Sequence, residues 1–325
     1  MKKTCFWLWL LLAGVAIAQQ DMGKPAEATQ DVATTATTHP TERVVVPTYA
    51  DRYCAGFISK QRLPDHTFVA GGLQSPHATK FVNGEVIYLV NSNFKDGDEL
   101  TLVRELRDPN RFESFMGQRG LLQATGQPYA ELGHAKIVDT RHKMAIAQID
   151  FSCEPVVPGD LAVPFIERDK LSFRSPVRFD RFAPGKTAGR IVLGKDFDNV
   201  MGTGNKVYLT IGSNQGLKPG DYLRVTRPYD ADLHNPVDAI SFKATTTEDT
   251  QLSPASIDTG RMGARYGRGP VIKVQDMPRR ALGELVVLST TSSSATGMVT
   301  FALEDIHVGD EVEMESPEPA TAEAK

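Results

Sequence analysis

The sequence has few of the residue patterns that enzymes and metal proteins need. Its three cysteines and seven histidines form no Cys-x-x-Cys, His-Glu-x-x-His or His-x-x-x-His spacing, so neither a structural zinc site nor a zincin is indicated. There is no Gly-x-Ser-x-Gly elbow for a serine nucleophile. Gly202-Thr203-Gly204 precedes a predicted strand and lacks the third glycine of a dinucleotide loop. We therefore expect a non-enzyme with no catalytic residues, no metal and no cofactor.

A basic excess is also missing. The formal net charge is -4, and it becomes more negative if residues 1–18, which contain Lys2 and Lys3, are removed. Proteins that bind nucleic acid without sequence preference neutralise phosphates with a surplus of lysine and arginine. We therefore expect no nucleic-acid partner.

Long apolar runs are confined to the N-terminus. Lys2 and Lys3 precede an apolar stretch from Cys5 to Ala18 that ends in small residues, which is typical of a cleaved signal peptide. The alternative, a transmembrane anchor, needs a longer run to span the hydrocarbon core. We predict a signal peptide over residues 1–18, no anchor after cleavage, and export to the periplasm or the exterior, with outer-membrane association as one option.

Large apolar residues are scarce at both ends of the expected mature chain. Residues 19–42 are rich in Ala, Thr, Gln and Pro, and residues 316–325 are rich in Pro and Glu. Such segments bury too little surface to offset the entropy lost on ordering. We predict a flexible N-terminal tether and a disordered tail.

What the sequence does contain is an internal repeat. The stretch from Leu132-Gly133 to Gly159-Asp160 aligns without a gap on the stretch from Leu282-Gly283 to Gly309-Asp310, which places Phe151 on Phe301. Upstream, Gly97-Asp98 corresponds to Gly220-Asp221. Such a match fixes which face of each strand a side chain points to, so both phenylalanines are expected in cores. Turn chemistry explains the Gly-Asp pairs better than metal binding does.

Each repeat reads as short β-branched or alternating strands bounded by Gly, Pro, Asn and Asp. Helical periodicity is almost absent, with one exception at Arg111–Thr125. A small sheet buries its faces and loses its edges by curling into a barrel. The sequence predicts a mainly β protein of two tandem small β-barrel-like modules, at 43–168 and 186–315, with an inter-module linker at 169–185 and a long insertion at about 230–280 in module two.

Two cysteines remain if the signal is removed. Cys54 and Cys153 would then lie in an oxidising compartment, where disulfides persist. We predict that they pair, which in the chain-entropy model contributes roughly 4 to 5 kcal/mol for a loop of about 100 residues. The alternative is two buried free thiols.

The second module carries a resemblance to a known family. Val207-Tyr208-Leu209, followed by Gly212 to Asp221, a Leu-Gly strand and a closing Gly-Asp, resembles the C-terminal domain of flagellar assembly protein T. The whole mature chain is also similar to uncharacterised acidobacterial-type secreted proteins that join a segment like Tyr53 to Ile58 to two such modules. The flagellar resemblance implies an assembly or binding role in the envelope and no catalysis.

The insertion in module two is the expected place for specificity. It supplies local positive charge on an acidic protein, at Arg261, Arg265 and Arg268 with Tyr266 between them. This pattern is suited to an acidic partner, an anionic glycan or a lipid headgroup. The alternative is a solvated loop whose arginines are balanced by its own acids. We expect envelope proteins as partners, with a cell-wall or glycan-binding module as the second hypothesis and a hydrolase as the third.

Overall fold

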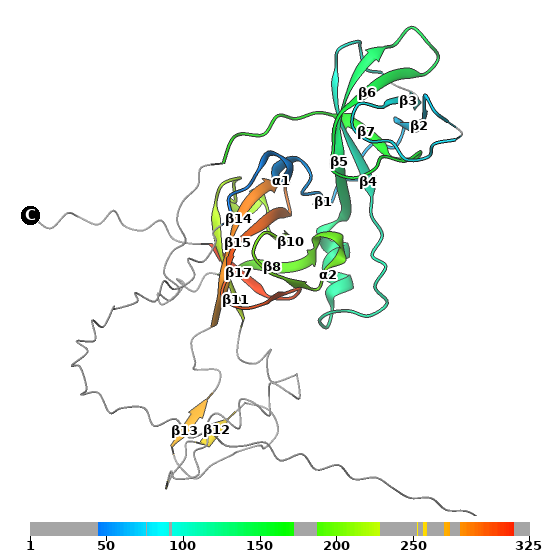
Figure 1. Ribbon diagram of the computed structural model, residues 1–325. Coiled ribbons are helices and arrows are strands. Elements are labelled where there is room, and N and C mark those ends of the chain that lie inside the picture. The colour runs from blue at the N-terminus through cyan, green and yellow to red at the C-terminus, as the bar shows by residue number, and fades with distance from the viewer. Residues whose placement is uncertain are drawn as a thin grey trace, which may run out of the picture. The chain divides into compact units, whose positions relative to one another are not determined.

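The computed structural model describes residues 45–75, 77–90, 93–171, 187–227, 252, 256–258, 270–273 and 280–314. Within them the protein is mainly β, and its strands form two closed barrels (Figure 1). The predicted fold class is therefore confirmed. The predicted signal peptide, the tether, most of the linker and the tail lie outside the described residues. No helix in the described part of the chain is long and apolar enough to cross a membrane.

The first barrel closes in the order β5-β4-β7-β2-β3-β6, because β6 also pairs with β5. A further strand, β1 (Phe57–Ser59), pairs with the start of β5 outside the closed set. The six barrel strands are β2 (Phe68–Gly72), β3 (Val86–Val90), β4 (Glu99–Glu105), β5 (Gln127–Asp139), β6 (Ala145–Ser152) and β7 (Leu161–Pro164).

The second barrel repeats this topology strand for strand, in the order β14-β11-β17-β8-β10-β15. Two short strands, β9 (Val200–Met201) and β16 (Ile306–His307), pair with each other beside it. Its six strands are β8 (Thr187–Gly194), β10 (Lys206–Leu209), β11 (Tyr222–Arg227), β14 (Arg280–Thr290), β15 (Ala295–Ala302) and β17 (Glu311–Met314). In the insertion, β12 (Ser256–Asp258) and β13 (Val271–Lys273) form a parallel pair.

The four Gly-Asp pairs occupy equivalent turns, as the repeat predicts. The N–H of Gly97 donates to the carbonyl of Ile137 at 2.9 Å, and that of Gly220 to the carbonyl of Val287 at 2.8 Å. At the other turn, Gly159 donates to Val69 and Gly309 donates to Ile191. All four glycines have positive φ, a conformation in which glycine carries no steric cost.

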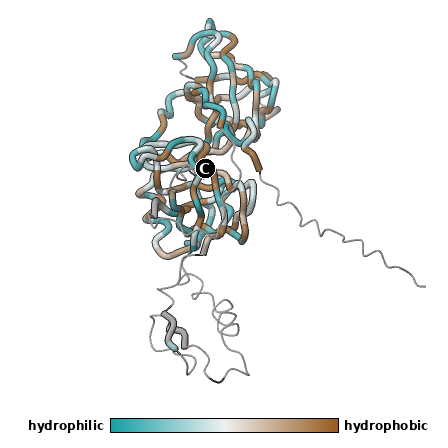
Figure 2. The backbone as a smooth tube through the Cα atoms, turned by 90° about the vertical axis from the view of Figure 1, so that its left-hand side faces the viewer, coloured by the Kyte–Doolittle hydropathy of each residue, from teal (hydrophilic) through white to brown (hydrophobic). Residues whose placement is uncertain are grey.

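Each barrel encloses its own apolar core. Figure 2 shows apolar and polar stretches alternating along the chain in both barrels. Repeat-related residues fill equivalent places, since Leu102, Ile137 and Ile149 lie in the first core and Val225, Val287 and Val299 lie in the second. Burial of such side chains contributes about 1.5 to 3 kcal/mol each.

The prediction that Phe151 and Phe301 both lie in barrel cores is wrong for Phe151. Phe301 is buried, whereas Phe151 is only partly buried and its ring packs against that of Tyr49, with 5.3 Å between centroids. Phe151 lies opposite His134 on β5, and both rings contact Tyr49 of a short helix, α1 (Tyr49–Tyr53), whose N-terminus is closed by a capping box between Thr48 and Asp51. This helix gives Phe151 an aromatic neighbour outside the core.

The predicted helical stretch at 111–125 forms a helix only in its second half. Helix α2 spans Gln118–Thr125 and begins after Gly117, whose positive φ interrupts any longer helix. Before it, Phe112 and Met116 are 87% and 98% exposed. Two short 3-10 turns, η1 (Lys195–Phe197) and η2 (Ser213–Gln215), complete the elements.

Candidate functional site

The two barrels are joined by the segment that precedes the first barrel. Strand β1 pairs with β5 of the first barrel, while three carbonyls of the same segment accept hydrogen bonds from the second. Tyr208 Oη donates to Ala55 O at 2.9 Å, Thr296 Oγ1 to Gly56 O at 2.8 Å, and Ser294 Oγ to Ile58 O at 2.6 Å. The segment 45–59 therefore forms hydrogen bonds with both barrels, and we call it the joint.

Small side chains make this joint possible. Gly56 has φ +74, and a Cβ built on it would lie 2.5 Å from Tyr208 Oη and 2.6 Å from the carbonyl oxygen of Tyr129. Ala55 is fully buried and packs with Val286, Leu288 and Met298 of the second barrel. Glycine and alanine at these positions let the backbone approach both barrels closely.

The predicted disulfide is present and fixes the joint to the first barrel. Cys54 is bonded to Cys153, 99 residues away, with 6.2 Å between Cα atoms. Cys153 directly follows β6, and its N–H donates to the carbonyl of Leu132 on β5. The cross-link therefore holds residues 45–59 at the place where β5 and β6 meet.

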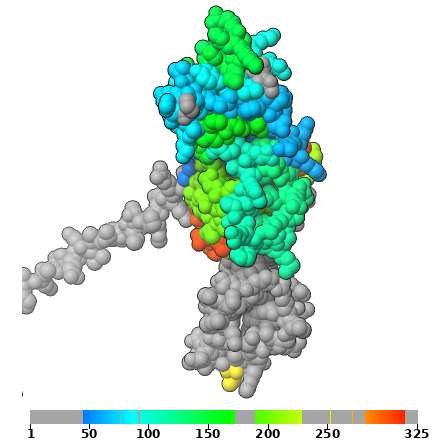
Figure 3. Space-filling view, turned by 90° about the vertical axis from the view of Figure 1, so that its right-hand side faces the viewer, coloured from blue at the N-terminus to red at the C-terminus, as the bar shows by residue number. Residues whose placement is uncertain are grey.

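A second contact between the barrels comes from the connection between β4 and β5. Gln118 Nε2 donates to the carbonyl of Val192 on β8 at 3.1 Å, and Phe115 packs against the core of the second barrel. The guanidinium of Arg190 lies 5.2 Å from the centre of the Phe115 ring. Figure 3 shows this connection, in green-cyan, beside yellow-green residues of the second barrel.

A buried ion pair lies at the junction. Glu131 on β5 is 3% exposed, accepts a hydrogen bond from the N–H of Gly56 at 3.2 Å, and binds the guanidinium of Arg168 through both oxygens. The backbone N–H of Arg168 donates to Tyr53 Oη at 2.8 Å. Burial raises the pKa of Glu131, and the charge of Arg168 opposes that rise.

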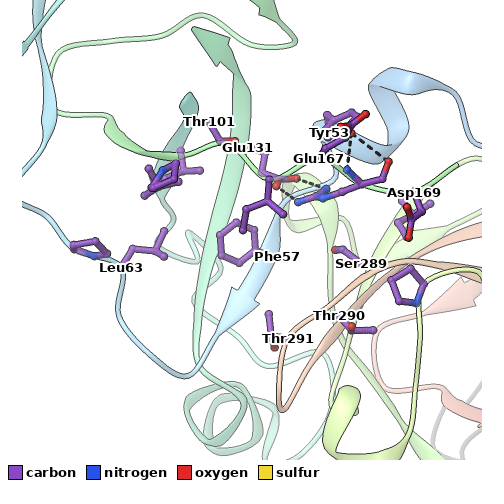
Figure 4. Close-up of a pocket in the computed structure, with 18 residues that line it drawn as sticks. Tyr53, Phe57, Leu63, Thr101, Glu131, Glu167, Asp169, Ser289, Thr290 and Thr291 are labelled. Carbon is purple, nitrogen blue, oxygen red and sulfur yellow. Dashed lines mark hydrogen bonds and ion pairs between the residues drawn. The ribbon is translucent and has the colours of Figure 1, made fainter. Parts of the chain in front are cut away.

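A cavity of about 590 Å³ opens beside this ion pair. A volume of this size is within the range of small-molecule and peptide pockets. Figure 4 shows Glu131 and Tyr53, which both bind Arg168, at one side of it. The lining comes from both barrels: Tyr53, Phe57, Leu63, Pro64, Thr101, Val103, Glu131, Val163, Pro164, Ile166, Glu167, Arg168, Asp169, Pro219, Leu288, Ser289, Thr290 and Thr291. We call this cavity the cleft.

A histidine lies inside an aromatic cluster near the joint. The ring centre of His134 is 4.4 Å from that of Phe165 and 4.9 Å from that of Tyr53. Its Nδ1 lies 3.4 Å from Tyr49 Oη, and its Nε2 has no hydrogen-bond partner among the described residues. Burial, with a smaller effect from Arg168, lowers the pKa of His134 to about 4. The ring is therefore neutral at physiological pH.

Only some of the residues singled out from the sequence lie in the part of the chain that the structure describes. Cys54 and Cys153 are brought together, whereas Arg261, Arg265, Tyr266 and Arg268 lie outside the described residues. Where the structure describes side chains, it holds no group of three His, Cys, Asp or Glu residues placed to bind a metal ion.

Sequence reasoning missed the cleft. Glu131 and Arg168 are far apart in the chain, and no spacing rule connects them. The signal that was present is the segment Tyr53-Cys54-Ala55-Gly56-Phe57-Ile58, because its small residues and its cysteine mark the joint.

Comparison with protein-family models finds none that matches this chain, and comparison with curated proteins also finds no match. The structure itself shows the class of protein: a chain that contains two six-stranded β-barrels joined to each other. The similarity to the flagellar and acidobacterial-type proteins stays a prediction.

Proposed function

We propose that this chain is an exported, non-catalytic interaction protein of the bacterial envelope, acting in assembly through its two joined barrels. The observation that carries the proposal is the cleft at the joint, about 590 Å³ in volume and lined by both barrels. The joint is held by a disulfide and by hydrogen bonds to each barrel. A pocket between firmly connected domains is a preferred place for binding, since little has to be ordered when the partner arrives.

The buried carboxylate of the cleft is engaged in structural contacts rather than free for catalysis. Glu131 is held by Arg168 and by the N–H of Gly56, so its oxygens are occupied by structural hydrogen bonds. A general acid or base must reach a substrate proton within hydrogen-bond distance. Freeing Glu131 for such a role would leave Arg168 without its partner in a partly buried place, which costs several kcal/mol.

Export is part of the proposal for two reasons. The N-terminal residues fit a signal peptide, and a disulfide of this kind persists in oxidising compartments. The insertion remains a second proposed contact, in which Arg261, Arg265, Tyr266 and Arg268 would meet acidic groups of the partner.

The test is sedimentation of the purified mature chain with two materials. One is an envelope fraction, before and after protease treatment, and the other is purified peptidoglycan. We expect retention on the envelope fraction that is lost after protease treatment. Retention on peptidoglycan would instead favour the glycan-binding alternative, and release of soluble fragments from peptidoglycan or protein would show that the chain is a hydrolase.

A further inference from the structure

The cleft has a specific chemistry that identifies the kind of partner it fits. Its walls are mainly apolar, and the apolar side chains that line it include Phe57, Leu63, Val103, Val163, Ile166 and Leu288. Ile166 is 75% exposed at the mouth, although burial of such a side chain contributes favourable free energy. An occupant with apolar side chains would cover Ile166.

One wall of the cleft offers hydroxyl groups. Ser289 and Thr290 at the end of β14 line the cavity, and Figure 4 shows them with Thr291 along this side. The side-chain hydroxyls of Ser289 and Thr290 make no hydrogen bond to another described residue. Hydroxyls both donate and accept, so they suit the alternating N–H and C=O groups of an extended backbone.

The charge at the mouth is negative. The positive charge of Arg168 is balanced by Glu131, and its guanidinium also donates to the carbonyl of Arg52. On either side of Arg168 in the chain, Glu167 and Asp169 are exposed, and neither carboxylate forms an ion pair with a described residue. The guanidinium of Arg52, which does not line the cleft, donates to the carbonyls of Arg168 and Asp169 and offsets part of this charge. The charged side chains of the lining itself still include more carboxylates than cations, which favours cationic over anionic ligands.

We propose that the cleft binds an extended segment of a partner protein in which apolar side chains are flanked by lysine or arginine. This proposal rests on the proposed function and names the chemistry of its partner. The apolar side chains enter between Phe57, Leu63 and Leu288, the segment's backbone bonds to Ser289 and Thr290, and its basic groups meet Glu167 and Asp169. Complementary charge at the rim chiefly sets specificity and the rate of association.

The experiment is isothermal titration of the full mature chain with two blocked pentapeptides, KLVLK and its charge-reversed counterpart ELVLE. We expect KLVLK to bind at least tenfold more tightly than ELVLE. The preference should weaken with added salt, because exposed charges are screened. Equal affinities, or no binding of either peptide at millimolar concentration, would overturn the proposal.

Substitutions at the mouth test whether the peptide KLVLK binds in the cleft. Ile166→Ser removes apolar surface at the mouth and should weaken KLVLK at least fivefold, whereas the matched control Val138→Ser, at an exposed position on β5, should leave its affinity unchanged. The double variant Glu167→Lys, Asp169→Lys should reverse the order of the two peptides. A reversal of preference cannot arise from unfolding, and its absence would contradict the assignment of the mouth.

Two outcomes separate this proposal from the proposed function. If neither peptide binds but Ile166→Ser retains protease-sensitive sedimentation with the envelope fraction, the cleft assignment fails and the function stands. If a soluble chitooligosaccharide, titrated in parallel, binds in the cleft and the peptides do not, both fail in favour of glycan binding.

Discussion

The guanidinium of Arg227 donates to both carboxylate oxygens of Asp310, at 2.7 and 2.8 Å. The repeat places Arg104 and Asp160 at the same positions of the first barrel, and they form the same pair, at 2.8 Å for both contacts. Each arginine also donates to a carbonyl of the turn, Asp305 or Pro155. The Arg227–Asp310 pair therefore links the closing Gly-Asp turn of the second barrel to strand β11. The Arg104–Asp160 pair links the closing turn of the first barrel to strand β4 in the same way.

This arrangement predicts unequal costs for breaking the two pairs. Asp310→Asn leaves Arg227, whose side chain is 11% exposed, without its charge partner and should lower the free energy of unfolding by about 3 kcal/mol. Asp160→Asn should cost less, since Arg104 is 31% exposed. Urea denaturation measures both. The control is Asp139→Asn, whose partner Arg141 is on the surface and whose loss should cost less than either of the other two substitutions. Equal costs in all three variants would contradict the account.

A second prediction concerns the joint. Gly56→Ala should destabilise the protein more than Gly84→Ala, although both glycines have positive φ. The Cβ at residue 84 meets open space, whereas the one at residue 56 meets Tyr208 and Tyr129. Backbone strain alone costs about 1 to 2 kcal/mol, and Gly56→Ala should exceed that. Thermal unfolding of the two variants gives the comparison, and similar losses would show that the joint tolerates a side chain.

A third prediction concerns the disulfide. Cys54→Ser with Cys153→Ser should lower the unfolding free energy by up to about 4 to 5 kcal/mol, because the unfolded chain regains the freedom of a long loop. The denatured but unreduced wild-type protein should take up no thiol reagent at these two positions. In the double variant, amide hydrogen exchange should rise first in residues 45–59, which lose their attachment to β6. An unchanged exchange pattern would mean that hydrogen bonds alone hold the joint.

The pH dependence of stability should contain a contribution from His134. In the unfolded chain its pKa is about 6.5, and in the folded protein burial lowers the pKa to about 4. Between these values the unfolded state binds the proton and the folded state does not, so the free energy of unfolding falls as pH drops from 6.5 to 4. After allowance for solvent screening the loss should be about 2 kcal/mol.

The measurement is the unfolding free energy at pH 7, 6, 5 and 4 for the wild type and for His134→Phe. A phenyl ring keeps the packing against Phe165 and Tyr53 and cannot take up a proton. The difference between the two proteins removes the contributions of carboxylates such as Glu131, which titrate in both. A difference that stays constant over this range would show that His134 is not responsible.

The two barrels and the equivalence of their Gly-Asp turns were predictable because strand period and turn chemistry are local. The match of Leu132-Gly133 to Leu282-Gly283 fixed which side chains face each core, and the pairing of Cys54 with Cys153 followed from their number and expected compartment. Phe151 was misplaced: it pairs with His134 and its ring contacts Tyr49, which comes from a segment outside the repeat.

The cleft was beyond sequence reasoning for a similar reason. Glu131 lies in a strand whose apolar pattern gives no hint of a buried carboxylate, and its partner Arg168 follows the last strand of the module. Only the closed barrel brings them together, and only the joint through Gly56 gives Glu131 its third hydrogen bond. Such tertiary pairs carry no fixed spacing along the chain.

The most direct test of the account is photo-cross-linking from the mouth of the cleft in cells that produce the chain. The photoreactive residue p-benzoylphenylalanine is placed at 166, and in a matched strain at 138, which is an exposed apolar position of the first barrel away from the cleft lining. We predict a defined adduct with an envelope protein from position 166, absent from position 138 and reduced by added KLVLK. Adducts of equal yield from both positions, or none from position 166, would contradict a partner-binding cleft.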